Sequence, residues 1–242
     1  SFRFYDHEKI RVGYFSPDFK NHPVSSLTAE LYEIHDRNKF EIHAFSFSRN
    51  TNDQLNIRIR NGVDHFHCVH SMSDQDVVAL SRSLKLDIAV DLAGFTRGCR
   101  PGIFALAAAP IQLGYIGFLG TMGASYYDYL ISDKTIIPEQ NQQYYSESIV
   151  YLPSYQVNDS RNHSLGMLLE RQDLGIPEGR FVYCCFNNTF KITPDIFDSW
   201  ARILEQVEHS VLMLYAKNRT TESNLKKEIS LRGVDPRRLV FG

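Results

Sequence analysis

Short apolar runs alternate with amphipathic segments along most of this chain. The apolar runs predict buried strands, and the segments whose apolar positions recur every three to four residues predict helices. In the first part of the chain, strands are expected at residues 10–15, 40–47, 63–69, 86–92, 111–116 and 128–132. Helices are expected between them at residues 24–34, 52–61, 73–84 and 101–108. Strands that alternate with helices favour parallel pairing with right-handed crossovers, and so an α/β fold.

The same alternation returns near the C-terminal end of the chain. Residues 152–178 show no strong periodicity and contain several prolines and glycines, so they are expected to connect two folded parts. Beyond them, strands are predicted at residues 180–186, 210–216 and 238–241, with helices at 193–207 and 221–232. The expected organisation is a Rossmann-like domain with a parallel sheet over 10–150, a connector over 151–179 and an incomplete second Rossmann-like half over 180–242. A lone half-unit would expose a sheet edge, so we expect the sequence to be cut inside its second domain.

Two helices have apolar stripes that indicate which residues face the core. Leu27, Leu31 and Ile34 share one stripe of the helix at 24–34. The helix at 193–207 begins with the capping pair Thr193-Pro194, and its predicted buried residues are Ile196, Trp200, Ile203 and Leu204. These stripes are expected to pack on the two sheets.

Composition and charge exclude several classes of protein. Hydrophobic residues make up 43% of the 242 residues and charged residues 22%, which is typical of a globular protein. The formal net charge of −2 gives no reason to expect nucleic-acid binding. No apolar run is long enough to span a bilayer and no signal segment is recognised, so we expect a cytoplasmic protein without a membrane span.

The cysteines indicate neither a zinc site nor a disulfide framework. Cys68, Cys99, Cys184 and Cys185 lack the C-x-x-C spacing, and the last two are adjacent in a predicted strand. Buried, reduced thiols and no disulfide are therefore expected.

Two loops carry the most suggestive chemistry. Residues 16–23 and 186–191 each follow a predicted strand and precede a predicted helix, where an α/β fold opens onto a ligand crevice. The first loop contains His22, which can move protons near neutral pH, and the second contains Lys191, which can hold phosphate charge. Asn188 belongs to the same predicted anion cradle. The sequence therefore suggests a site assembled between two α/β halves.

Three further features have competing interpretations. Asp91 ends an apolar strand, and either a functional role or hydrogen bonds to loop amides around Gly94 would account for a carboxylate there. Asp74-Gln75-Asp76 has the D-x-D pattern of a metal site, but Ser73 followed by Asp76 is a helix-capping pattern, so no metal site is expected. The glycine-rich segment 117–123 lacks known phosphate-binding spacings and predicts a tight loop.

Taken together, several segments resemble the catalytic region of the O-linked N-acetylglucosamine transferase family. They cover most of the chain from about residue 10 onward, in the order and spacing of the family. The matching segments are Arg11–Phe19 with Asn21-His22-Pro23, Asp91–Thr96, Ala109–Tyr115 with Gly120-Thr121, Asp128-Tyr129 with Asp133, and Phe186–Ile192.

The resemblance implies a GT-B architecture and metal-independent, inverting transfer of N-acetylglucosamine from UDP-GlcNAc to serine or threonine hydroxyls of a protein or peptide. UDP-GlcNAc would be a substrate, and no cofactor is implied. By resemblance, His22 is an active-site histidine, Asp91 an active-site aspartate and Lys191 the lysine that neutralises the departing diphosphate. Asn188, Thr96, Gly120 and Thr121 fall at donor-binding positions. Asn188 stands where the family often has glutamine.

The resemblance also implies parts outside this sequence. Members of the family usually carry tetratricopeptide repeats before this region, and a histidine and a Thr-Thr-Asp group of the donor site after it. Two alternatives stay open: the same fold using UDP-glucose or GDP-fucose, or a non-catalytic interaction module. His22 or Asp91 could each serve as the base.

Overall fold

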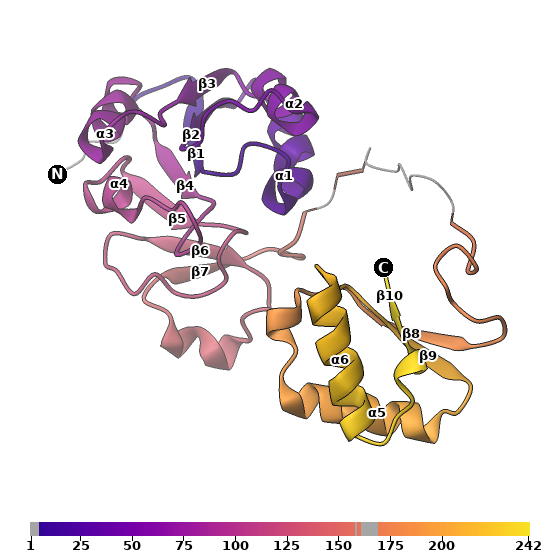
Figure 1. Cartoon of the computed structure of the whole chain (residues 1–242). Helices are drawn as coiled ribbons and strands as arrows, with labels where there is room; N and C mark the ends of the chain where they lie inside the picture. Colours follow the sequence, from indigo (N-terminus) through magenta and orange to yellow (C-terminus); the bar gives the residue numbers. More distant parts are fainter. Residues whose placement is uncertain (1–4, 158, 161–168) are drawn as a thin grey trace. The chain divides into compact units, whose positions relative to one another are not determined.

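The chain divides into two compact units in a computed structural model, which describes residues 5–157, 159–160 and 169–242. One unit spans Ser1–His163 and the other Ser164–Gly242. Figure 1 shows both along the chain, from indigo at the N-terminus to yellow at the C-terminus. The predicted connector at 151–179 therefore includes residues that lie outside the described part, namely 158 and 161–168.

The first unit is built on a seven-stranded parallel sheet with the strand order β3-β2-β1-β4-β5-β6-β7. Its strands are β1 (Ile10–Ser16), β2 (Phe40–Ser46), β3 (His65–Cys68), β4 (Ile88–Asp91), β5 (Ile111–Gly114), β6 (Tyr129–Ser132) and β7 (Ser148–Tyr151). β1 pairs in parallel with both β2 and β4, which confirms the predicted parallel sheet. The edge strand β7 was not predicted from the sequence.

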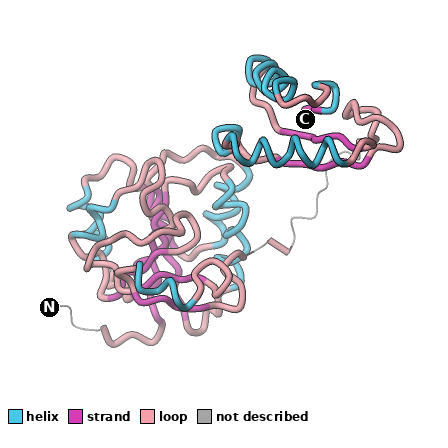
Figure 2. Tube along the Cα trace, turned by 90° about the horizontal axis from the view of Figure 1, so that it is seen from below, coloured by secondary structure: helices cyan, strands magenta, loops and turns pink. Residues whose placement is uncertain are grey.

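Helices cover both faces of this sheet. They are α1 (Pro23–Ile34), α2 (Gln54–Gly62), α3 (Asp74–Ser83) and α4 (Pro101–Ala105), and a further 3-10 helix, η1 (Glu139–Tyr144), buries none of its residues. α1 and α2 lie on one face and α3 and α4 on the other (Figure 1), and Figure 2 shows the strands edge-on between the helices. Ser73 and Asp76 form a reciprocal capping box at the start of α3, which confirms the helix-capping interpretation of Asp74-Gln75-Asp76.

Each face of the sheet has its own apolar core. On the α1 and α2 side, Tyr32 and Ile59 pack against strand residues such as Ile42. On the α3 and α4 side, the rings of Phe15 and Phe45 stack with their centroids 4.4 Å apart. Burial on both faces explains why these parallel strands read as continuous apolar runs in the sequence.

The second unit is a smaller parallel sheet with the strand order β10-β9-β8. It consists of β8 (Phe181–Cys185), η2 (Thr189–Lys191), α5 (Pro194–Gln206), β9 (Ser210–Leu214), α6 (Arg219–Leu231), η3 (Pro236–Arg238) and β10 (Leu239–Phe241). This is the predicted β-α-β-α-β order. Ile176, from the predicted connector, packs on this sheet, whereas Tyr155 from the same segment packs in the first unit's core.

Some predicted burial is wrong. Ile34 is 68% exposed, although Leu27 and Leu31 on the same stripe do pack against the core. In α5, Ile196 and Ile203 are exposed, and the buried residues are Phe197, Ala201 and Leu204. Leu204 and the partly buried Trp200 do pack in the core as predicted, whereas Phe197 and Ala201 are buried in place of Ile196 and Ile203.

All four cysteines are free, but they are not buried as predicted. Cys68 and Cys184 are exposed, while Cys99 and Cys185 are half-buried. Cys68 and Cys184 lie on strands that are themselves partly exposed. None of the helices in the described ranges is both long and apolar enough to cross a bilayer.

Candidate functional site

The strand order places a cleft at the carboxyl ends of β1 and β4. β2 and β3 follow on one side of β1, and β4 and the later strands follow on its other side, so the strand order reverses between β1 and β4. The loops that leave the strands at such a switch point run in opposite directions and leave a crevice between them. A cleft of about 720 Å³ lies here, with lining residues that come mainly from the loops after β1 and β4. They are Pro17, Asp18, Lys20, His22, Val24, Ser48, Thr96, Arg97, Gly98 and Gly117.

His22 lines this cleft at the N-cap of α1. Its Nδ1 accepts a hydrogen bond from the backbone N–H of Val24 at 3.3 Å and lies 3.6 Å from Oδ2 of Asp18. When Val24 occupies the Nδ1 lone pair, a neutral imidazole carries its proton on Nε2. The Nε2–H group is then a hydrogen-bond donor, and the side chain is 38% exposed, so that a ligand can reach it.

Two cations accompany His22 in the cleft. Nζ of Lys20 lies 3.6 Å from Oδ1 of Asp18 and donates to Oγ of Ser48 at 3.4 Å. Arg97 is exposed on the loop after β4. With one carboxylate against two cations, the cleft has an excess of positive charge, which suits a phosphate-bearing ligand. The sequence analysis did not single out Lys20 or Arg97, although the rule that selected His22, a loop after a parallel strand, applies equally to them.

Asp91 ends β4, just before the loop whose Thr96 and Arg97 line the cleft, and it is 4% exposed. Its Oδ1 accepts hydrogen bonds from the backbone N–H groups of Ala93 at 2.8 Å and Gly94 at 3.2 Å. Its Oδ2 accepts one from the hydroxyl of Tyr127 at 2.6 Å. Burial raises the pKa of the Asp91 carboxyl, and these hydrogen bonds act against that rise. The bonds from the amides of Ala93 and Gly94 are those that the sequence analysis gave as the alternative to a functional role for Asp91.

Two glycines let the loops around the cleft approach closely. A Cβ on Gly117 would lie 1.8 Å from the carbonyl oxygen of Leu92, closer than any side chain allows. Gly98 has a φ of +83°, and a Cβ there would lie 3.1 Å from Cβ of Pro17, across from the loop after β1. The close packing of these loops depends on both glycines.

The donor-binding candidates of the first unit do not all reach the cleft. Thr96 lines it, and its Oγ1 donates to the carbonyl oxygen of Ala93 at 2.7 Å. Oγ1 of Thr121 instead donates to Oε2 of the buried Glu147 at 2.7 Å. This bond ties the glycine-rich loop to the segment before β7. Among the described residues that line the cleft, neither Gly120 nor Thr121 is present.

The second unit carries its candidates in the loop between β8 and α5. Lys191 ends η2 and is exposed, and its backbone N–H donates to the carbonyl oxygen of Asn188 at 3.0 Å. α5 begins shortly afterwards at Pro194, and its N-cap residue Thr193 makes no side-chain capping bond. A helix N-terminus without such a cap presents backbone N–H groups that can bind an anion. Lys191 and the start of α5 thus lie at the carboxyl end of β8, as predicted.

One set of side chains has the composition of a metal site, although no metal site was predicted. Glu41, His43 and His65 bring ligand atoms within 4.8 Å of one another, in the part of the chain that the structure describes. No motif spacing indicated this set, because its members come from two strands that are distant in sequence. It lies outside the cleft lining.

These features define an α/β protein of the Rossmann type, with a cationic cleft at the switch point of its first sheet and a second phosphate-suited loop in its second unit. Sequence comparison identifies the family: the profile of glycosyl transferase family 41 matches residues 2–168 and 159–242. The chain belongs to glycosyl transferase family 41, and so to the glycosyltransferases with the GT-B fold.

Individual relatives agree with this assignment. The chain is 36% identical over 240 residues to the probable UDP-N-acetylglucosamine–peptide N-acetylglucosaminyltransferase SEC of Arabidopsis thaliana, covering 97% of this chain and 25% of that protein. A mutant O-GlcNAc transferase of Thermobaculum terrenum superposes with a TM-score of 0.88 at 29% identity, covering 98% of this chain and 45% of that one. A glycosyltransferase of Rickettsia africae shares the fold, with a TM-score of 0.61 at 10% identity. The chain spans about a quarter of the length of the curated relatives that it matches.

Proposed function

We propose that this chain forms part of a site that transfers N-acetylglucosamine from UDP-GlcNAc to serine or threonine hydroxyls of a protein, by a metal-independent and inverting displacement. The hydroxyl oxygen would attack the anomeric carbon in line with the departing UDP, the bond from that carbon to the diphosphate oxygen would break, and the hydroxyl proton would pass to the departing diphosphate or to solvent. The observation that carries the proposal is the cationic cleft at the β1/β4 switch point, in a chain of family 41. The names of the relatives support the choice of donor sugar and acceptor.

We infer that His22 acts as a hydrogen-bond donor in this reaction. The bond from Val24 to Nδ1 favours the tautomer with a proton on Nε2. Such a nitrogen can bind a phosphate or sugar oxygen but cannot take a proton from the acceptor hydroxyl. A role as base needs the other tautomer, in which Nδ1 carries the proton and Nε2 is free to accept one. In that tautomer Nδ1–H would give up the bond from Val24 and donate to Oδ2 of Asp18, which lies 3.6 Å away.

Asp91 is proposed as a positioning residue. Both of its oxygens already accept hydrogen bonds from the protein, and it is buried and not among the cleft-lining residues. It holds the loop that carries Thr96 and Arg97, and it is itself held by Tyr127. A carboxylate with these partners fixes the shape of the cleft, and a precise shape is what an in-line displacement needs.

Lys191 is proposed to stabilise the diphosphate as the sugar leaves. The lysine and the first N–H groups of α5 lie together at the carboxyl end of β8, so both present positive charge there. Negative charge grows on the leaving group in the transition state, where fixed donors accelerate the reaction most.

Sugar transfer by the full-length protein that contains this chain tests the proposal. Radiolabelled UDP-GlcNAc, UDP-glucose and GDP-fucose are each supplied with an acceptor peptide, with and without a chelator. We expect transfer from UDP-GlcNAc alone, unchanged by the chelator, with inverted anomeric configuration in the product. Preference for UDP-glucose or GDP-fucose would show that the protein transfers that sugar in place of N-acetylglucosamine. Absence of transfer from all three donors would favour the non-catalytic interaction module.

A further inference from the structure

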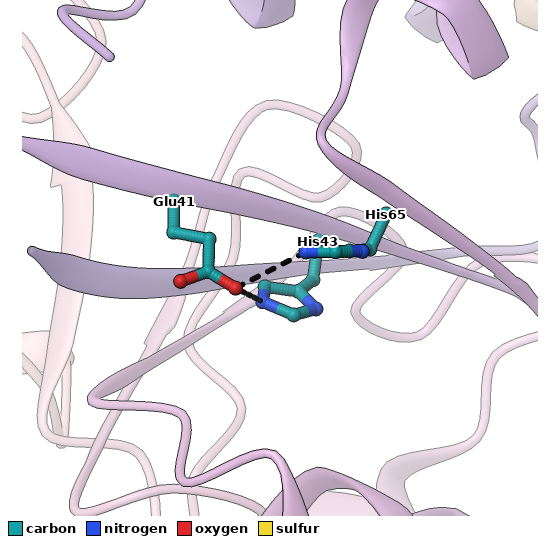
Figure 3. Close-up of side chains that lie close together, drawn as sticks. All are labelled: Glu41, His43 and His65. Atoms are coloured by element: carbon teal, nitrogen blue, oxygen red, sulfur yellow. Dashed lines mark hydrogen bonds and ion pairs between the residues drawn. The ribbon is translucent and has the colours of Figure 1, made fainter. Parts of the chain in front are cut away.

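A cluster of histidines and one glutamate lies at the edge of the first sheet. Glu41 and His43 lie on β2, and His65 is the first residue of the edge strand β3. In the parallel register His43 lies opposite His65, and residues two apart on β2 point to the same face. Figure 3 shows one carboxylate oxygen of Glu41 directed at both imidazole rings.

The distances in the cluster match those between ligands of one metal ion. Oε1 of Glu41 lies 3.2 Å from Nε2 of His43 and 3.1 Å from Nε2 of His65. Two ligand atoms that are each about 2.0 Å from a tetrahedral Zn²⁺ lie roughly 3.3 Å apart. The three ligand atoms fall within 4.8 Å of one another, so one ion can reach them all with small side-chain shifts.

Neighbouring side chains hold the ligands in place. Nδ1 of His43 lies 3.1 Å from Nε2 of His67, so the Nδ1–H group can donate a hydrogen bond to His67 and leave the lone pair on Nε2 of His43 for a metal. Nε of Arg11 donates to Oε2 of Glu41 at 3.1 Å, which leaves Oε1 directed at the histidines. The side chain of His43 is 1% exposed and that of His65 is 49% exposed, so the cluster has a fixed inner side and an open outer side.

We propose that Glu41, His43 and His65 form a binding site for a divalent transition-metal ion of the Zn²⁺ type, with water in the remaining position. Imidazole nitrogens with one carboxylate oxygen are a ligand set that Zn²⁺ accepts. The ion would join β3 to β2 and so secure an edge strand of only four residues. The cleft lies past the carboxyl ends of the strands, whereas this cluster lies within the first half of β2 and at the start of β3. None of its residues lines the cleft, so the proposed site is structural and separate from sugar transfer.

Titration of the tag-free chain with ZnCl₂ in a calorimeter tests the proposal, and Co²⁺ absorption reports the coordination geometry. We expect one equivalent of Zn²⁺ to bind with a micromolar or lower Kd. His65→Gln removes an exposed ligand and should raise Kd by at least about a hundredfold, because loss of even an outer-shell partner typically costs ten- to a hundredfold. His67→Gln should cost about ten- to a hundredfold. His70→Gln, an exposed histidine outside the cluster, is the matched control and should leave Kd unchanged.

The melting temperature is a second readout that does not depend on calorimetric heats. Zn²⁺ at a hundredfold excess over Kd should raise the melting temperature of the wild type and of His70→Gln, but not of His65→Gln. The proposal is overturned if the wild type takes up no Zn²⁺ at millimolar concentration, or if His65→Gln and His70→Gln bind it equally well. Because the readouts are metal binding and melting temperature, either result leaves the proposed sugar transfer to be judged by its own assay.

Discussion

The hydroxyl of Tyr127 donates a 2.6 Å hydrogen bond to Oδ2 of Asp91, and both side chains are buried. Tyr127→Phe would leave that oxygen without this partner. A buried acceptor left unsatisfied costs about 1–3 kcal/mol, so the free energy of unfolding should fall by that amount. Urea denaturation measures it, with Tyr129→Phe as the control on a ring that is 40% exposed. Equal effects of the two variants would contradict a structural role for the Tyr127 hydroxyl.

Asp91→Asn separates positioning from base catalysis. An asparagine oxygen can still accept from Ala93 and Gly94, so the loop should be partly retained. If Asp91 acts by position, we expect turnover of the full-length enzyme to fall while the pH dependence of kcat/KM keeps its acid limb. Loss of that limb in the variant would instead identify Asp91 as the group that removes the acceptor's proton.

His22 combines helix capping with a place in the cleft, and two substitutions separate these roles. His22→Ala should lower stability by about 1 kcal/mol through loss of the cap and should also abolish transfer. His22→Asn supplies a good capping residue, so it should restore most of the stability without restoring turnover. Thermal melting and peptide glycosylation by the full-length protein measure the two effects. Full activity of His22→Asn would remove His22 from the reaction.

Lys191→Ala should reduce turnover by about a hundred- to a thousandfold, the usual effect of losing one preorganised donor. The side chain is exposed, so the free energy of unfolding should change by no more than about 0.5 kcal/mol. Lys227→Ala, on an exposed position of α6, is the matched control and should alter neither. Near-normal turnover of Lys191→Ala would exclude the lysine from diphosphate stabilisation.

Gly117→Ala should be strongly destabilising, because its Cβ would meet the Leu92 carbonyl oxygen at 1.8 Å and backbone would have to move. We expect a loss of roughly 2 kcal/mol or more, as for other overpacked sites. Gly123→Ala has open space around it and only a positive φ of 63°, so it should cost about 1 kcal/mol. Similar stabilities of the two variants would show that the loop at Gly117 can relax.

His35 should make the first unit less stable in mild acid. Its side chain is partly buried, and its Nε2 lies 2.9 Å from the hydroxyl of Tyr14. Burial and the charge of Arg37 lower the pKa of His35, while Asp64 acts in the opposite direction. A histidine whose pKa is lower when folded stabilises the protein above its unfolded pKa of about 6.5, and that stabilisation is lost as the pH falls through the folded pKa.

Urea denaturation near pH 7.5 and near pH 5.5 tests this expectation. The wild type should lose more free energy of unfolding between the two conditions than His35→Gln. Parallel losses in the two proteins would show that His35 titrates with the same pKa in both states.

The sequence predicted the strands well because parallel strands buried on both faces form apolar runs. It missed β7, an edge strand in which Val150 is 40% exposed. In α5 it chose Leu204 and Trp200 correctly but Ile196 and Ile203 wrongly, since Ile196 and Phe197 are adjacent apolar residues and only the packed sheet decides which one is buried.

The site was predictable to the extent that it depends on single loops. His22 and Lys191 lie in the loops where strand–helix order placed them. Thr121 is not among the cleft-lining residues and bonds Glu147 far along the chain, and the approach of His43 and His65 depends on strand register. Both are long-range pairings that local patterns do not specify.

The distribution of the cysteines provides a route to spectroscopy. Cys68 and Cys184 are the exposed thiols of the described residues, and they fall one in each compact unit. A thiol-reactive dye or spin label on each would form a natural donor–acceptor pair without engineered residues. The distance between the labels, followed while nucleotide sugar is added, would report whether the separation of the two units changes in solution.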